Sequence, residues 1–291
     1  METFIITTDA CSDLTDDIVK TENISIMPMV FGKDEKEYHH YQDQREMKIT
    51  DFYDEMRQKE IYRTTLVNPT DFYHFFTELL KQGKDILYIA FSSALSGTYQ
   101  SATIAIDMLK GEYPNQKIIA VDTLSASFGE GYLVYRAAFL RKEGKTIEEI
   151  ASWIEENKLK LNHIFTVEDL GTLKRGGRLS STAAIIGSLL RIKPILHVNN
   201  EGKLVALSKA VGRKKSLNDM IEVIKNQIVD PTTQTIFIGH GDALEDAQFV
   251  GNTLKKELKV KDVVYSFIGP VIGSHSGPGT IAVFFMGDKR E

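Results

Sequence analysis

Hydroxyl side chains follow a short apolar stretch near residue 90. Ser92 and Ser93 come directly after the run Ile86–Phe91, and Ser96 precedes a helical pattern that begins at Thr98. The run has the length and composition of a buried strand. A strand that ends in hydroxyls before a helix favours an anion, because the first helical turn offers free N–H groups and a positive dipole end. The alternative is that Ser93 or Ser96 only caps the helix, as serine often does.

Two other polar motifs could take part in the same chemistry. Thr64 and Thr65 are adjacent hydroxyl residues before an extended turn that ends at Pro69. His275 lies in the glycine- and proline-rich segment Gly269–Gly279, which we expect to be a rigid loop. A free imidazole titrates near pH ~6.5, so His275 could donate a hydrogen bond to a carboxylate. The alternative is a histidine that only bonds backbone in a tight turn.

A serine-dependent hydrolase is one enzymatic interpretation of these residues. Ser93, His275 and Asp122 could form a nucleophile, a base and an orienting acid. The segment around Ser93 lacks both glycines of the G-x-S-x-G elbow, and nothing in the sequence shows that the three residues meet. The hydrolase that uses Ser93 and His275 therefore remains an alternative.

Glycine, histidine and cysteine motifs suggest little further chemistry. The segment Gly239–Gly241 resembles half of a dinucleotide fingerprint, but Leu244 stands where the third glycine belongs, which leaves a nucleotide or sugar-phosphate module as a third hypothesis. His39 and His40 are adjacent without other metal-ligand spacing. Cys11 has no partner that would make its thiol reactive. We expect no metal and no cofactor.

The composition is typical of an ordinary globular protein. The 291 residues are 42% hydrophobic and 26% charged, with a formal net charge of -5, which argues against a nucleic-acid-binding face. No apolar run approaches the roughly 20 residues that span a bilayer. A single cysteine fits a reducing compartment. Together with the absence of a signal-peptide pattern, these features predict a cytoplasmic protein that does not insert stably into a membrane.

Strand patterns alternate with helical patterns along the chain, which predicts an α/β fold built from parallel units with helices on both faces. Ligands bind such sheets beyond the carboxyl ends of the strands. The segments that follow three predicted strands should therefore share one rim: Asp9, Ser92-Ser93 and Asp122–Ser125.

A polar helix near residues 146–160 suggests a domain boundary. We predict an N-terminal domain over 1–160 with a mainly parallel sheet, and a mixed α/β domain over 161–291 that contains a hairpin around Asn199–Gly202. In the first domain we expect a solvated loop at Lys33–Lys48, and a helix from Leu14 capped by Ser12 or Asp13.

Six motifs together resemble the DegV family, in order and spacing, over essentially the whole chain. They are Thr8-Asp9-Ala10-Cys11-Ser12-Asp13-Leu14, Thr64-Thr65-Leu66-Val67-Asn68-Pro69, Phe91-Ser92-Ser93-Ala94-Leu95-Ser96-Gly97-Thr98, Asp122-Thr123, Leu173-Lys174-Arg175-Gly176-Gly177-Arg178, and the terminal segment Gly269–Gly279.

The resemblance implies a two-domain DegV-like fold that binds one long-chain fatty acid and has no catalytic activity of its own. It places the carboxylate on Thr64 or Thr65 and on Ser93, with Ser92 and His275 close by. A dry slot would hold the tail, and we expect it to be lined by segments such as Ala183–Leu190 and Val271-Ile272. The first domain would hold the head and the second would enclose the tail.

The resemblance also implies a protein partner. Some members are the fatty-acid-binding subunits (FakB) of bacterial fatty acid kinase, which present the carboxylate to an ATP-dependent kinase subunit for acyl phosphate and phospholipid synthesis. The family's docking surface is basic, which would assign Arg175, Arg178 and Arg213 to docking. Without the resemblance, these arginines would be interpreted as solvated surface charge, or as a docking face for an acidic partner.

Overall fold

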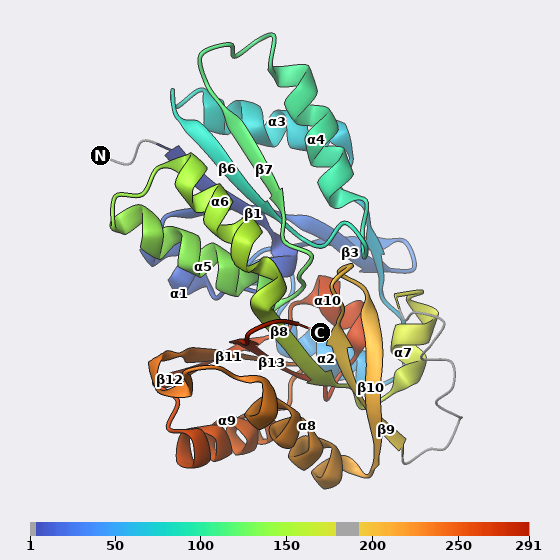
Figure 1. The fold of residues 1–291 in the computed structure, drawn as a ribbon. Helices are drawn as coiled ribbons and strands as arrows, with labels where there is room; N and C mark the ends of the chain where they lie inside the picture. The colour runs from blue at the N-terminus through green and yellow to red at the C-terminus, as the bar shows by residue number, and fades with distance from the viewer. Residues whose placement is uncertain (1–3, 179–191, 291) are drawn as a thin grey trace.

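The N-terminal part of the chain is built on a parallel sheet (Figure 1). The computed structural model describes residues 4–178 and 192–290. Four neighbouring strands pair in parallel in the order β2 (Ile24–Met27), β1 (Phe4–Asp9), β6 (Asp85–Ala90) and β7 (Ile118–Asp122). The strand predicted from Ile86 is thus confirmed as a central strand of this sheet. Parallel pairing brings the ends of β1, β6 and β7 to one edge, as the sequence predicted.

Helices cover both faces of this sheet (Figure 1). Ile86, Tyr88 and Ala90 of β6 pack into one core, and the alternating Leu87 and Ile89 pack into another, as the period of a strand requires. The first face is covered by α3 (Pro69–Leu80) and α4 (Thr98–Leu109). The second face is covered by α5 (Phe128–Lys142) and α6 (Ile147–Asn157). The short helix α1 (Asp16–Thr21) precedes β2 in the chain. The capping box of Thr146 and Glu149 begins α6.

A small antiparallel sheet extends from this layer. Its strands lie in the order β4 (Lys36–His40), β3 (Met29–Lys33) and β5 (Arg63–Thr65), beside α2 (Ile49–Arg57). The prediction of a loop over Lys33–Lys48 was therefore wrong for β4, whereas residues 41–48 do lie outside helices and strands. Asp34 takes a positive φ of 52° at a tight turn, so β4 pairs back on β3, and Tyr38 stacks on Phe31 with ring centroids 5.5 Å apart.

The C-terminal part forms a six-stranded mixed sheet. Its order is β10 (Leu204–Val211), β9 (Ile192–Val198), β8 (Leu161–Thr166), β13 (Ile281–Met286), β11 (Thr235–His240) and β12 (Asp262–Phe267). The antiparallel pairing of β9 with β10 confirms the predicted hairpin. The fold is therefore the expected mixed α/β architecture.

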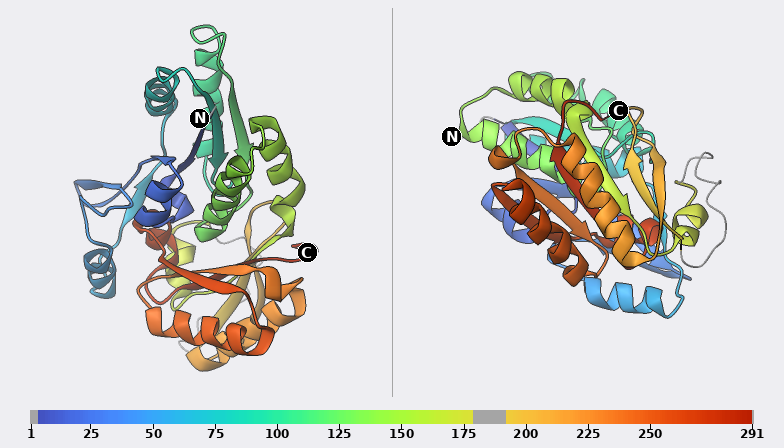
Figure 2. Two further views of the ribbon diagram at one scale, coloured as in Figure 1. Left: turned by 90° about the vertical axis from the view of Figure 1, so that its left-hand side faces the viewer. Right: turned by 60° about the horizontal axis from the view of Figure 1, so that its bottom comes forward.

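This mixed sheet has an outer and an inner face. Figure 2 shows α8 (Arg213–Gln227) and α9 (Leu244–Leu258) across the outer face. The inner face turns toward the parallel sheet, where Phe237 packs edge-on against Phe128 of α5. Because this core includes residues from both parts of the chain, the domain boundary between residues 160 and 161 stays a prediction.

Two short helices complete the region between the sheets: α7 (Leu170–Arg175) and α10 (Pro270–Ser276). The prediction of a rigid loop over Gly269–Gly279 was wrong for its first part. Pro270 occupies the first helical turn, and Gly277 ends the helix with a positive φ of 82°. The residues that suggested a loop are thus the start and stop signals of α10.

Asp13 also differs from its expected role. Thr15 caps α1 with its side chain, whereas Ser12 and Asp13 are buried in front of that helix. The expected tail-lining segment Ala183–Leu190 lies outside the described residues.

Candidate functional site

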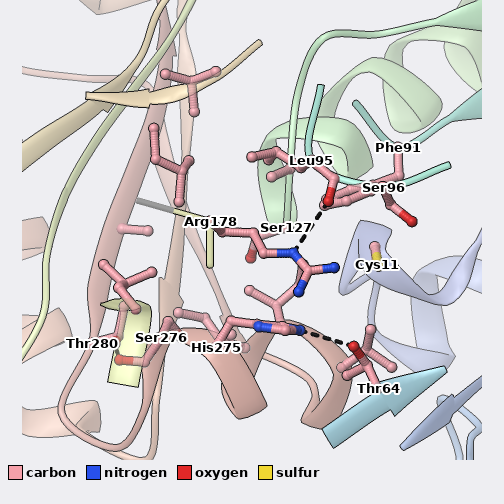
Figure 3. A pocket seen from close by; sticks show the side chains of 18 of the residues that line it. Cys11, Thr64, Phe91, Leu95, Ser96, Ser127, Arg178, His275, Ser276 and Thr280 are labelled. Carbon is pink, nitrogen blue, oxygen red and sulfur yellow. Dashed lines mark hydrogen bonds between the residues drawn. The ribbon is translucent and has the colours of Figure 1, made fainter. Parts of the chain in front are cut away.

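A cavity of about 270 Å³ lies between the carboxyl edge of the parallel sheet and the inner face of the mixed sheet (Figure 3). Segments that follow β1, β6 and β7 reach it, as do β5 and α10. Most of its wall is apolar, including Phe91, Phe165, Leu204, Val271, Ile272 and Phe284. Val271 and Ile272 thus lie where the sequence analysis expected lining residues.

Hydroxyl and imidazole groups gather at one end of the cavity. The Thr64 hydroxyl lies 2.9 Å from Nε2 of His275, which joins β5 to α10 across 211 residues of sequence. Thr65 and Leu66 also line the cavity, and Leu66 is 50% exposed at its mouth. The structure therefore brings three predicted residues to one place: Thr64, Thr65 and His275.

His275 is neutral at physiological pH. Burial, followed by the charge of Arg178, lowers the pKa of its imidazole to about 4. Its Nε2 faces Thr64, and its Nδ1 has no hydrogen-bond partner among the described residues. Gly176 lies against Nδ1 so closely that a Cβ there would collide with the ring. Gly176 therefore gives the imidazole the space that it occupies.

The segment directly before α4 supplies a further hydroxyl. Ser96 lines the cavity, and its Oγ lies 2.8 Å from the hydroxyl of the buried Thr98. The cap position belongs to Gly97, which offers no side-chain bond. The cap interpretation holds in part for Ser96, because its Oγ accepts from the backbone N–H of Thr98, the first residue of α4, over 3.3 Å. Ser96 is also a polar lining residue of the cavity that the sequence analysis did not assign to the site.

Ser92 and Ser93 lie elsewhere. The buried Ser92 donates from Oγ to the carbonyl of Gly202, 3.0 Å away, and so ties the end of β6 to the β9–β10 hairpin. Ser93 is exposed, and its backbone N–H donates to the carboxylate of Asp122 over 3.2 Å. Neither serine is among the residues that line the cavity within the described chain.

The catalytic triad considered from the sequence is not assembled. His275 pairs with Thr64, and Asp122 accepts from the backbone N–H groups of Ser93 and Leu124. No hydrogen bond joins Ser93 to His275. The nucleotide hypothesis also finds no support, because Gly239 lies within β11 and the N–H of Gly241 donates to the carbonyl of Thr280 rather than facing an open phosphate site.

The three arginines assigned to docking have different surroundings. Arg178 lines the cavity and donates to the carbonyls of Leu95 and Gly176 over 3.3 and 2.6 Å. Arg175 is exposed and donates to the Thr172 hydroxyl. Arg213 pairs with Asp246 at 2.8 Å and with Glu168 at 3.9 Å. Thus Arg213 is already neutralised, and Arg178 faces inward.

Buried carboxylates support the cavity from behind. Asp13 accepts from the backbone N–H of Gly269 over 2.9 Å and from the Ser127 hydroxyl over 2.5 Å. Asp9 accepts from the N–H of Phe91 and the hydroxyl of Tyr88. Burial raises the pKa of both acids, that of Asp13 to about 8. These acids hold α10 and the segments after β6 and β7 in place.

The described residues form neither a metal site nor a membrane-spanning helix. No group of three or more histidine, cysteine, aspartate or glutamate residues there is arranged to hold a metal ion. Within the same part of the chain, no helix combines the length and apolarity needed to cross a bilayer.

Comparison with known proteins gives consistent matches over the whole chain. Residues 3–288 match a family model described as "Uncharacterised protein, DegV family". A DegV domain-containing protein of Clostridium perfringens is 49% identical over 291 residues, which is 100% of each chain.

Solved structures share the fold. A DegV family protein from Thermus thermophilus, whose structure is described as showing fatty acid binding, has a TM-score of 0.88 at 28% identity over 98% of this chain and 99% of its own. A protein from Bacillus subtilis, described as DegV, a fatty acid binding protein, has a TM-score of 0.84 at 28% identity, with 99% of this chain and 100% of its own covered.

Proposed function

This chain belongs to the DegV family, and we propose that it binds one long-chain fatty acid in the cavity between its two large sheets. One observation carries the proposal: the largely apolar wall of the cavity includes the hydroxyls of Thr64 and Ser96, and Thr64 pairs with the neutral His275. Related DegV proteins that are described as fatty acid binders support it.

The two ends of the cavity suit the two ends of such a ligand. Burial of methylenes contributes roughly 0.8 kcal/mol each, so about 14 of them offer on the order of 11 kcal/mol before ordering costs. Hydrogen bonds to an ionised acceptor are among the strong ones, so hydroxyl donors favour the carboxylate. Leu66 lines the cavity and is also exposed, so the carboxylate of the ligand could reach the surface beside Thr65 and Leu66.

In this proposal Thr64, with Thr65 beside it, contacts the carboxylate, and Ser96 replaces Ser93 as the serine contact. The reason is position, because Ser96 lines the cavity whereas Ser93 is exposed outside it. His275 holds the Thr64 hydroxyl in place through its Nε2.

The test identifies the lipid that co-purifies with the protein and measures the lipid that the delipidated protein binds. Denaturing extraction followed by mass spectrometry should release a long-chain fatty acid, and delipidated protein should bind hexadecanoic acid with a stoichiometry near one. Ser96→Ala should weaken that binding, whereas the matched variant Ser93→Ala should leave it unchanged. Delipidated protein that binds no fatty acid at all would refute the proposal.

We further propose that the chain is a non-catalytic subunit that presents its ligand to an ATP-dependent fatty acid kinase in the cytoplasm. Exposed Arg175 is the best candidate for the docking contact, since Arg213 is paired and Arg178 faces the cavity. Kinase-dependent ATP consumption should require the loaded protein and should fall in Arg175→Glu, while fatty acid binding persists. ATP consumption that ignores the loaded protein would contradict the partnership.

A further inference from the structure

The apolar wall of the cavity contains an imidazole, that of His163 on β8. His163 lines the cavity and is 2% exposed. Successive strand residues point to opposite faces of a sheet. Ile164 accordingly packs in the outer core, whereas His163 and Phe165 both line the cavity from the inner face. The His163 ring stands edge-on to Phe284 of β13, with ring centroids 5.3 Å apart, so it is part of an otherwise aromatic and aliphatic wall.

His163 lies away from the polar end of the cavity. Thr280 donates from its hydroxyl to the carbonyls of Ser276 and Gly277, which ties the start of β13 to the end of α10. In the register of β13 with β8, Ile281 is opposite Thr166 and Phe284 is opposite His163. Three residues of strand rise about 10 Å. A ligand whose carboxylate contacts Thr64 beside α10 would therefore pass His163 with its chain and not with its head.

Hydrogen bonding fixes the tautomer of His163. Its Nδ1 lies 3.2 Å from the carbonyl of Leu161, and a carbonyl only accepts, so Nδ1 carries the proton. Burial, followed by the charge of Arg290, lowers the pKa of the imidazole, so the ring is neutral. Nε2 is therefore a bare acceptor. It is buried and has no hydrogen-bond partner among the described residues.

The surroundings of Nε2 offer it no donor. Gly129 of α5 lies against it so closely that a Cβ there would collide with the ring. The hydroxyls of two other lining residues are already used, because Ser127 donates to Asp13 and Thr280 donates to the end of α10. A buried acceptor that has lost its water without gaining a donor is unfavourable, and a plain alkyl chain has no donor to give. The wall is thus incomplete until a neutral donor reaches Nε2.

We propose that the cavity takes a hydroxy fatty acid, and that Nε2 of His163 accepts a hydrogen bond from a hydroxyl on the middle of its chain. This inference rests on the proposed function and deepens it, because it names the class of fatty acid. A hydroxyl is small and uncharged and donates one bond, which suits a single acceptor in an apolar wall. An amine or a second carboxylate would instead bring a charge beside Phe284, which is costly without a partner.

A cycle between the hydroxyl on the ligand and the imidazole on residue 163 tests this role. Octadecanoic acid is compared with 10-hydroxyoctadecanoic and 12-hydroxyoctadecanoic acids, which share its head and its length. Binding of each is measured to delipidated wild-type protein, His163→Phe and His163→Gln, with His74→Phe as a control. Phenylalanine keeps a ring against Phe284 without the acceptor, whereas glutamine keeps an acceptor at the end of its side chain. His74 is exposed on α3 and does not line the cavity.

Wild-type protein should bind at least one of the two hydroxy acids about threefold or more tightly than octadecanoic acid. His163→Phe should weaken binding of that hydroxy acid about tenfold, because its buried hydroxyl then has no partner, and should leave binding of octadecanoic acid no weaker. His163→Gln should keep part of the preference, and His74→Phe all of it. Thermal unfolding of each variant verifies that the fold persists.

Two outcomes would overturn the inference. Wild-type protein that binds octadecanoic acid as tightly as both hydroxy acids would show that a bound water, and not the ligand, serves Nε2; this comparison needs no variant. Equal weakening of all three acids in His163→Phe would show that the imidazole only shapes the wall. Failure of the wild-type protein to bind any of the acids would instead count against the proposed function, so the two failures are distinguishable.

Discussion

Replacing Asp13 by asparagine should make the protein more stable at alkaline pH. Asp13 is 3% exposed and accepts hydrogen bonds from the N–H of Gly269 and the hydroxyl of Ser127. An asparagine keeps an acceptor for Gly269 and offers an amide donor to Ser127. The backbone φ of 50° at this position is one that asparagine tolerates well. The substitution therefore removes a charge while preserving the local contacts.

The difference between the pKa of Asp13 in the folded and unfolded states determines how the stability depends on pH. Burial raises the pKa of Asp13 from 3.8 to about 8, so the folded state holds a proton that the unfolded state has already lost. Wild-type stability therefore falls as pH rises from about 4 to about 8, and levels off above that. Four pKa units at 1.36 kcal/mol each make the cost of the buried charge on the order of 5 kcal/mol above pH 8. Below both pKa values the cost vanishes.

Urea unfolding of the wild-type protein and Asp13→Asn at several values from pH 3.5 to pH 9 measures this cost. The pKa values of Asp9 and Glu130 are also raised by burial, and their charges interact with that of Asp13, so the difference measures the charge of Asp13 together with its repulsion by these two acids. Asp288→Asn is the matched control at an exposed aspartate. A stability difference between wild type and Asp13→Asn that stays constant with pH would refute the reasoning.

Three further predictions concern the cavity. Thr64→Val removes a hydroxyl donor at nearly constant volume and should weaken binding of hexadecanoic acid about tenfold in a titration of delipidated protein; unchanged affinity would contradict the assigned head position. Gly176→Ala should push the His275 ring from its place and shift its imidazole NMR signals, whereas Gly111→Ala, where a methyl meets open space, should leave them as they are. Ala282→Phe fills the wall of the cavity and should reduce affinity for an 18-carbon acid more than for a 10-carbon acid in the same titration; an equal loss for both lengths would place the tail elsewhere.

The frame of the fold could be predicted from local patterns. The short apolar runs that became β1, β6 and β7 have the strand period, and parallel pairing then fixes which loops share an edge. The helix α10 was missed for a specific reason. Proline at its start and glycine at its end are also loop markers, and seven residues are too few to show a helical period.

The polar end of the cavity depends on contacts that local patterns do not encode. Thr64 meets His275 across 211 residues, and the inward turn of Arg178 depends on the carbonyl of Leu95, 83 residues away, as well as on that of the nearby Gly176. A sequence motif identifies residue types that can do the chemistry, but burial and long-range packing decide which of them reach the ligand. The structure accordingly places Thr64, Thr65 and His275 at the cavity and leaves Ser92 and Ser93 outside it, a distinction that the motifs alone did not make.

The three serines after β6 illustrate how the choice among similar residues is made. The backbone turns sharply there, with the N–H groups of Leu95 and Ser96 both donating to the carbonyl of Ser92. This turn buries the Ser92 hydroxyl against Gly202 and leaves Ser93 in solvent, so only Ser96 returns to the cavity wall at the start of α4. Gly202 makes this contact possible. Its positive φ of 78° and its missing side chain let the β9–β10 hairpin come close enough for the Gly202 carbonyl to accept from the Ser92 hydroxyl. One serine thus fastens the two sheets together, and this contact positions the other serine at the site.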